Sequence, residues 1–380
     1  MKKNLFFLAA AALALASCSS DETVESAALS KSNEINFRPL VNSSTRAADI
    51  TLSNLASFVV NAKIAGAETS YFDDVTFTKV DASATYTSAT KYYWPATGNL
   101  DFYAYSPASN SQVTYTNYKT FEVQPSTTVA SQVDLVYAAT KGKNKTSNAD
   151  GVVLNFRHTG SKIVCEVKNT STALKFSVEG WKVGFLDNKG KFTFADTNTD
   201  GNNTGSGTTL TAGQWTENTT QDVNNAYSST FGAVDIAAGA SETALTGEMI
   251  LVPQIINKAT AYAHTGATAA GDNLNGTFIA VKLKIFNATN DAVIASDGAN
   301  HMWAIWPIGG TAGSFSWAPG KKYTYTIDLA GGGYYETNQA ETTVDEDLDP
   351  IIADAVIKFV SVTVDSWVEE TAIPVSGGVN

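Results

Sequence analysis

Short runs of alternating apolar and polar residues recur along this chain from about residue 50 onward, separated by clusters of Gly, Asn, Asp, Ser and Thr. Alternation with a period of two is typical of a strand that has one face on a core and the other in water. Repeated at intervals of about 8–15 residues, such runs predict an all-β protein of the sandwich class. The predicted strands are Ser57–Ile64, Tyr71–Val80, Leu100–Tyr105, Lys119–Val123, Val152–Phe156, Lys162–Lys168, Phe176–Leu186, Lys191–Phe194, Met249–Val252, Thr277–Phe286, Met302–Pro307 and Tyr323–Leu329.

The length of 380 residues exceeds that of one ordinary domain. We therefore expect two tandem β-sandwiches, residues 47–170 and 171–340, divided at the polar stretch 169–172. In the second sandwich, the turn residues Asp187–Gly190 predict a hairpin that joins the strands on either side of them.

The first residues have the pattern of an export signal. Lys2 and Lys3 precede a short apolar stretch, residues 5–14, and small residues then lead to Cys18. We expect residues 1–17 to be a signal peptide and residues 18–46 to be a propeptide.

One further alternating run, residues 34–41, lies ahead of the first sandwich. Ile35, Phe37 and Val41 share one side of it, which predicts a half-buried strand. A polar loop follows in which Arg46 precedes Ala47, and exposed polar loops are where proteases cut. The position favours cleavage after Arg46; the alternative, which residue type alone favours, is a solvated surface arginine.

The C-terminal region, residues 341–380, consists of an acidic lead and a long strand rich in β-branched residues. We expect it to lie outside both sandwich cores, as a spare strand available to a partner. Its apolar residues, with the first three on one face of the strand, are Val360, Val362, Val364, Trp367, Val368, Ile373 and Val375.

Charge and composition narrow the possible functions. The formal net charge is −12 and the isoelectric point about 4.7, which excludes nucleic acid as a partner because phosphates would be repelled. The chain has only three histidines, scattered along it, which argues against an enzyme, a metal site or a cofactor. We expect His158 to be a structural residue at a strand end and Cys165 to be a buried free thiol.

One segment resembles the start of a calcium-binding loop. Asp196, Asn198, Asp200 and Gly201 have the right spacing, but Gly207 stands where the loop requires a glutamate. The spacing therefore favours a polar hairpin tip over a calcium site.

Aromatic residues raise the question of a sugar-binding platform. Tyr92, Tyr93 and Trp94, or Trp303 and Trp306, could stack on a sugar, but aromatic residues in strands usually belong to a core.

Several strand motifs, in this order along the chain, resemble those of FimA-like fimbrillins, the structural subunits of type V pili. Residues 15–18 also resemble the lipobox of bacterial lipoproteins, and the acidic run after Cys18 resembles the tether of Bacteroidales-type surface lipoproteins. The strand motifs are Tyr92–Pro95, Leu100–Pro107, Asp134–Ala138, Val152–Val167, Gly247–Gln254, Trp317–Leu329 and Val362–Glu370.

The resemblance implies two transthyretin-like β-sandwiches and export as an outer-membrane lipoprotein precursor, with lipid on Cys18. It also implies that an Arg-specific extracellular protease cuts between Arg46 and Ala47 and so removes the strand at residues 34–41. The tail of another copy would fill the groove and build a head-to-tail polymer, the cell-surface fimbrium, with anchor and tip subunits as further partners.

Two other functions remain open from the sequence. The first is a surface lipoprotein that acts as a tip adhesin or binds glycans and keeps residues 18–46. The second is a secreted hydrolase on a sandwich scaffold, which the missing catalytic constellation disfavours.

Overall fold

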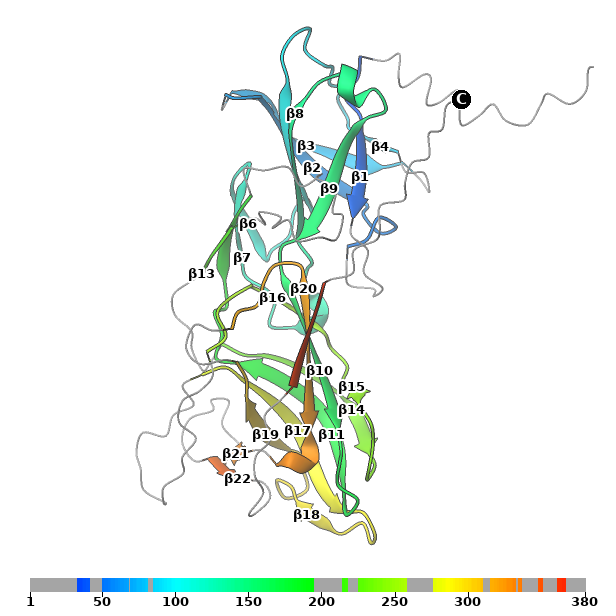
Figure 1. Ribbon diagram of the computed structural model, residues 1–380, viewed down its shortest axis with the longest axis vertical. Coiled ribbons are helices and arrows are strands. Elements are labelled where there is room, and N and C mark those ends of the chain that lie inside the picture. Colours follow the sequence, from blue (N-terminus) through cyan, green and yellow to red (C-terminus); the bar gives the residue numbers. More distant parts are fainter. Residues whose placement is uncertain are drawn as a thin grey trace, which may run out of the picture.

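The computed structural model describes residues 33–41, 50–67, 69–80, 85–194, 214–217, 225–257, 276–309, 315–332, 334–336, 348–350 and 361–366. The molecule is elongated, with one β-sandwich at each end (Figure 1). The all-β prediction is confirmed. Helix occurs within these ranges only as three short 3-10 turns, η1 (Val129–Ser131), η2 (Thr146–Asn148) and η3 (Leu329–Gly331).

The N-terminal sandwich is built on a seven-stranded sheet, here called the β8–β9 sheet. One face of this sheet carries a core rich in phenylalanine, which includes Phe58, Phe102 and Phe156, each fully buried. In spatial order its strands are β1 (Phe37–Val41), β9 (Val152–His158), β8 (Val136–Lys143), β5 (Leu100–Ser106), β2 (Ser57–Ile64), β3 (Ser70–Lys79) and β4 (Tyr86–Thr87).

The other face of the β8–β9 sheet packs on a four-stranded sheet, the β7–β12 sheet. Phe121 and Phe192 stack there with ring centroids 5.6 Å apart, and Tyr137 of β8 meets Phe192 edge-on at 4.8 Å. The strands are β13 (Gln214–Glu217), β12 (Gly190–Thr193), β7 (Thr120–Val123) and β6 (Val113–Asn117).

The C-terminal sandwich encloses one core between two sheets. The five-stranded β10–β20 sheet has the order β15 (Thr243–Ala244), β10 (Ser161–Lys168), β20 (Lys321–Asp328), β23 (Ser361–Ser366), with β16 (Met249–Leu251) also on β10. The opposite sheet, the β11–β17 sheet, has the order β14 (Tyr227–Ile236), β11 (Leu174–Gly184), β17 (Phe278–Asn287), β19 (Met302–Pro307), β21 (Tyr334–Glu336), β22 (Leu348–Pro350), with β18 (Val293–Ala295) on β17.

The change from one core to the next falls earlier than the predicted boundary at residue 170. β10 pairs with β20 in parallel, and its Ile163, Cys165 and Val167 are fully buried in the C-terminal core. The alternation of β10 marks which of its faces is buried but carries no information on its partner strands. The boundary between sandwiches therefore lies at Thr159–Gly160, between β9 and β10.

The hairpin predicted at residues 187–190 is wrong. β12 pairs with β7 and β13 in the β7–β12 sheet and not with β11. A Cβ atom at Gly190 would lie 2.7 Å from Val252 Cγ1, so this close approach requires glycine. The segment after β11 thus returns to the N-terminal half and contributes to its middle core.

The C-terminal strand also differs from expectation. Residues 361–366 are not outside the sandwiches but pair antiparallel with β20 as the edge strand β23. An open β20 edge would expose unpaired backbone groups, and β23 covers them. Val362 remains 38% exposed at this edge.

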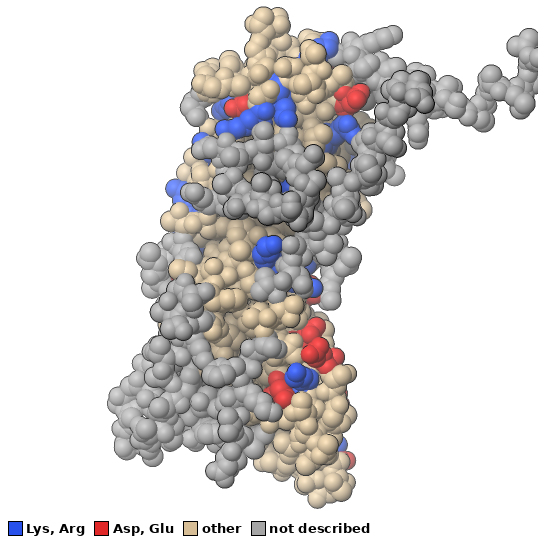
Figure 2. All heavy atoms as spheres, viewed as in Figure 1, with Lys and Arg blue, Asp and Glu red and all other residues tan. Residues whose placement is uncertain are grey.

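The charged side chains are unevenly distributed. In the view of Figure 2, Lys and Arg atoms gather over the N-terminal sandwich, whereas Asp and Glu atoms are more prominent over the C-terminal one. Among the described residues, no helix is long and apolar enough to cross a membrane.

Phe192→Ala tests whether β12 is part of the N-terminal half. Removing this fully buried ring should lower the free energy of unfolding by about 3–5 kcal/mol, because it leaves a cavity between Phe121 and Tyr137. Urea unfolding measures the change, with Val293→Ala as control, because Val293 is 56% exposed and should change stability little. Equal stabilities of the two variants would contradict the packing described.

Candidate functional site

The candidate site is the groove in the N-terminal sandwich that β1 fills. β1 lies parallel to β9, in a register that runs from Phe37 opposite Val152 to Val41 opposite Phe156. β1 forms the end of the sheet, so β9 is the strand through which it is joined to the rest (Figure 1).

The residues just before β1 are also held from the opposite side. Ile35 donates its N–H to Tyr92 O at 2.8 Å, and Trp94 donates to Asn33 O at 2.9 Å. Val152 donates its N–H to Asn36 O at 2.8 Å. The segment 33–36 therefore lies between residues 92–94 and β9, whereas β1 itself has a sheet partner on one side.

The inward side chains of β1, together with that of Ile35 just ahead of it, complete the N-terminal core. Ile35, Phe37 and Val41 are 2%, 4% and 5% exposed, whereas Leu40 is 43% exposed on the outward face. The alternation read from the sequence is thus present in the structure. At about 1.5–3 kcal/mol for each buried apolar side chain, burial of these residues contributes several kcal/mol to holding the strand.

Phe37 is the central contact of this strand. Its ring meets three phenylalanines edge-on, with centroids 4.8 Å from Phe77, 5.3 Å from Phe102 and 6.2 Å from Phe58. These rings belong to β3, β5 and β2, so one side chain of β1 contacts three strands across the curved sheet. Edge-on contacts of this kind add to the area term.

Polar contacts fix the outer side of the segment. Lys91 Nζ lies 2.9 Å from Glu34 Oε2, and the hydrogen bond to this carboxylate raises the pKa of Lys91. The pair is solvent-exposed, so it orients the strand more than it stabilises it. At Gly151, which has φ +98°, a Cβ atom would lie 3.2 Å from Arg38 Cγ, so β1 approaches the backbone of this turn closely.

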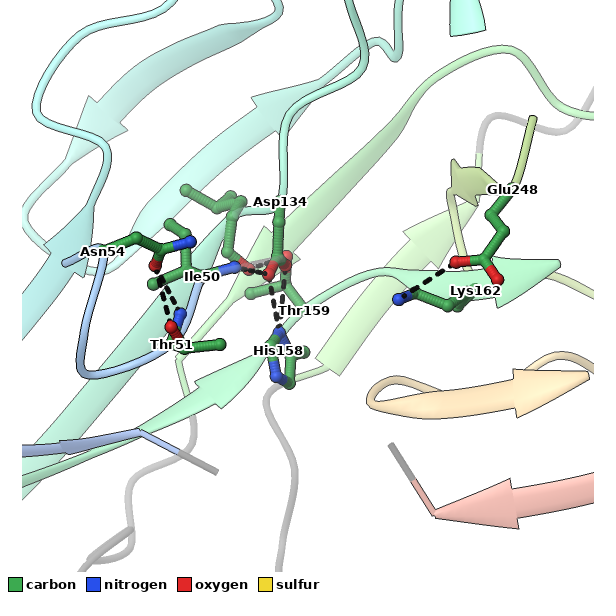
Figure 3. Close-up of polar contacts among 9 residues, drawn as sticks. Ile50, Thr51, Asn54, Asp134, His158, Thr159, Lys162 and Glu248 are labelled. Atoms are coloured by element: carbon green, nitrogen blue, oxygen red, sulfur yellow. Dashed lines mark hydrogen bonds and ion pairs between the residues drawn. The ribbon is translucent and has the colours of Figure 1, made fainter. Parts of the chain in front are cut away.

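The chain downstream of residue 46 has a separate anchor, shown in Figure 3. Ile50 donates its N–H to Asp134 Oδ2 at 2.8 Å, and Asp134 Oδ2 also lies 2.8 Å from His158 Nδ1. The Asp134 side chain is fully buried and that of His158 is 2% exposed. Thr51 then donates its N–H to Asn54 Oδ1 at 2.6 Å, which closes a turn.

Comparison with known proteins agrees with this architecture. A family model described as fimbrillin-like matches residues 45–354, which is most of the chain. The chain belongs to the fimbrillin-like family.

A solved structure shows the same fold at low sequence identity. A fimbrial protein from Bacteroides vulgatus is 16% identical, with a TM-score of 0.51 and coverage of 88% of this fimbrillin-like chain and 100% of that chain. The tip fimbrial protein Mfa3 from Porphyromonas gingivalis, with C-terminal truncation, is 10% identical, with a TM-score of 0.37 and coverage of 88% and 100%. No curated protein sequence matches the chain.

Several predicted site residues of this fimbrillin-like chain lie outside the described residues, so the roles predicted for them stay predictions. They are Cys18, Arg46, Ala47, Val360, Trp367, Val368, Ile373 and Val375, together with the loop residues Asp196, Asn198 and Asp200. Val362 and Val364 lie in β23, where they pair with Tyr325 and Tyr323.

Buried polar and thiol groups of the fimbrillin-like chain have structural surroundings. Cys165 is a free, fully buried cysteine, as predicted, and burial raises the pKa of its thiol. His158 lies at the end of β9 against Asp134. The described residues contain no group of three or more potential metal ligands.

The aromatic candidates do not form one exposed platform. Tyr93 is 50% exposed, but the adjacent Trp94 is buried against Phe102 at 5.9 Å. Trp306 is also buried, and its indole N–H donates to Gly332 O. Sequence reasoning missed the Asp134 anchor, whose only trace is an acidic residue at the start of an otherwise apolar strand motif.

Phe37→Ala tests the central contact of the groove. In the uncleaved protein it should lower the free energy of unfolding by about 3–5 kcal/mol, because three ring contacts are lost. Leu40→Ala is the matched control on the outward face of the same strand and should cost well under half as much. Thermal unfolding of both variants measures this, and a larger effect at Leu40 would contradict the assigned face.

Proposed function

We propose that this chain is the stalk subunit of a cell-surface fimbrium and polymerises by strand exchange after proteolysis. A cut after Arg46 frees residues 18–46, β1 leaves its groove, and the C-terminal tail of another copy takes its place. Lipid on Cys18 holds the precursor at the outer membrane until that cut. Anchor and tip subunits would end the polymer.

One observation carries this proposal. The N-terminal core is completed by side chains that lie ahead of Arg46, namely Ile35, Phe37 and Val41, each nearly fully buried. Loss of this segment would leave an apolar groove and an unpaired β9 edge, which is unfavourable in water. A strand from a second molecule restores both the burial and the hydrogen bonds.

The anchor at Ile50 supports the proposal from the other side of the cut. Residues from Ile50 onward are fixed to the buried Asp134 independently of β1. Leu55 is also buried and donates its N–H to Thr51 O at 2.9 Å. Loss of the propeptide would therefore leave the start of the first sandwich in place.

The tail is less firmly held than β1. β23 pairs with β20 at the edge of its sheet, and Val362 is 38% exposed there, compared with 4% for Phe37. Moving β23 to another subunit thus breaks the backbone hydrogen bonds between β23 and β20 but exposes little of the C-terminal core at Val362. Since each added subunit offers a new tail, the contact between tail and groove repeats head to tail, and it builds a filament instead of a closed ring.

Arg46→Gln tests the processing step. An arginine-specific endoprotease should cut the wild type once, after Arg46, to give a chain that begins at Ala47 and forms ladders on gels of unboiled samples. The Arg46→Gln variant should remain uncut and monomeric. Arg38→Gln is the control, because Arg38 lies in the paired strand β1 and should not be the site of cleavage.

Intact mass and N-terminal sequencing, also of the protein taken from cells, measure this outcome. Cut chains that stay monomeric at all concentrations would contradict strand exchange. Material on cells that begins at Cys18 would instead support a surface lipoprotein that keeps its propeptide.

Val362→Asp tests the tail. A charge at this position should abolish polymerisation of the cut protein, because a carboxylate cannot be buried in the apolar groove. The monomer should stay folded, since Val362 is already partly exposed. Thr363→Asp, on the other face of β23, is the matched control and should still assemble. Normal assembly of Val362→Asp would show that another part of the tail fills the groove.

A further inference from the structure

The C-terminal strand β23 ends at the junction of the two sandwiches. Its last residue, Ser366, pairs with Lys321 at the start of β20. The neighbouring Gly320 donates its N–H to Gly160 O at 2.8 Å, and Gly160 belongs to the two-residue link between β9 and β10. Ser366 therefore lies near the level at which β9 ends.

The direction of β23 determines where the following residues go. β10 runs away from the junction, β20 is parallel to β10, and β23 is antiparallel to β20. The C-terminal end of β23 therefore points toward the N-terminal sandwich of its own subunit. Figure 1 shows β23 beside β20, below β1 and β9.

The length of chain beyond β23 is sufficient to reach the β1 groove. Val41, at the near end of β1, pairs with Phe156, four positions before Gly160, which is about 13 Å of extended chain. β23 lies two strand positions from β10, and β1 lies one position from β9, so the sideways offset is at most three strand spacings, about 14 Å. Combined with about 13 Å along the strand, this offset makes the path roughly 20 Å. Residues 367–380 extend to about 45 Å, so enough remains to cover the five-residue site.

The chemistry of this segment fits the groove. The path of roughly 20 Å takes about six residues, so Ile373 and Val375 are the first apolar residues that reach the groove, and in an extended chain they lie on one face. The groove offers phenylalanine rings from β2, β3 and β5. A tail that enters from the junction would run antiparallel to β9, opposite to β1, and antiparallel pairing is at least as stable as parallel pairing.

We propose that, once β1 has left, residues 367–380 fill the groove of their own subunit and cap it. This inference rests on the proposed function and adds a regulation to it: insertion in the same chain competes with donation to a neighbour. A short tether gives an effective concentration of about millimolar. Cut subunits in dilute solution are therefore closed monomers, and filament growth requires subunits or a filament end concentrated enough to displace the tethered tail.

Hydrogen exchange of the cut full-length chain tests this proposal. The protein is cleaved with an arginine-specific endoprotease, separated from the released peptide by size exclusion at about 1 μM, and compared with a chain that lacks residues 367–380. Amides of Val152, Leu154 and Phe156, which lie in the part of β9 that pairs with β1, should be protected when the tail is present. Without the tail they should exchange at least about tenfold faster.

The uncut proteins are the matched control. With β1 in the groove, deletion of residues 367–380 should leave the exchange of these three amides unchanged. Equal exchange in the two cut proteins, whether fast or slow, would overturn insertion in the same chain, as would released peptide that stays bound to the monomer.

The same preparations separate this inference from the proposed function. Oligomer ladders at higher concentration, together with tail-independent exchange in the dilute monomer, would sustain strand exchange between subunits and reject capping. If the tail protects the β9 amides but no oligomer bands form on gels, the polymer is rejected and the capped monomer is retained.

Discussion

The open side of β9 is the constraint on which the rest of this structure depends. A strand that has a partner on one side only, next to an apolar core, must be covered, because both its backbone groups and the core would otherwise meet water. β1 meets this requirement with Phe37, which contacts phenylalanines from three other strands. The covering strand comes from a segment ahead of the family match, which begins at residue 45.

The same requirement recurs in the C-terminal sandwich. There β23 covers the edge of β20, but its Val362 stays partly exposed. The two terminal strands thus differ in burial: β1 has a deeply buried face, whereas β23 is partly exposed at Val362. Under the proposed strand exchange, this difference would explain why the N-terminal segment needs proteolysis before it leaves, whereas the tail can be redirected.

Polar contacts also join the two sandwiches at their junction. Gln132 Oε1, from the segment ahead of β8, accepts the N–H of Ile250 in β16 at 2.7 Å. Within the C-terminal sandwich, Lys162 Nζ of β10 lies 3.5 Å from Glu248 Oε2 (Figure 3). Trp215 of β13 donates its indole N–H to Thr159 O at 2.9 Å. The hydrogen bonds of Gln132 and Trp215 involve neither β1 nor β23.

The sequence by itself determined the class of the fold, most strands and the buried face of β1, because alternation with period two reports directly which side of a strand avoids water. It failed for β14, whose side chains are mostly exposed along a sheet edge and therefore show little alternation. Only the tertiary structure decided that β10 joins the second core, that β12 returns to the first half and that β23 lies on β20. Periodicity encodes the face of a strand but not its neighbour, and neighbours are chosen by packing between residues far apart in the chain.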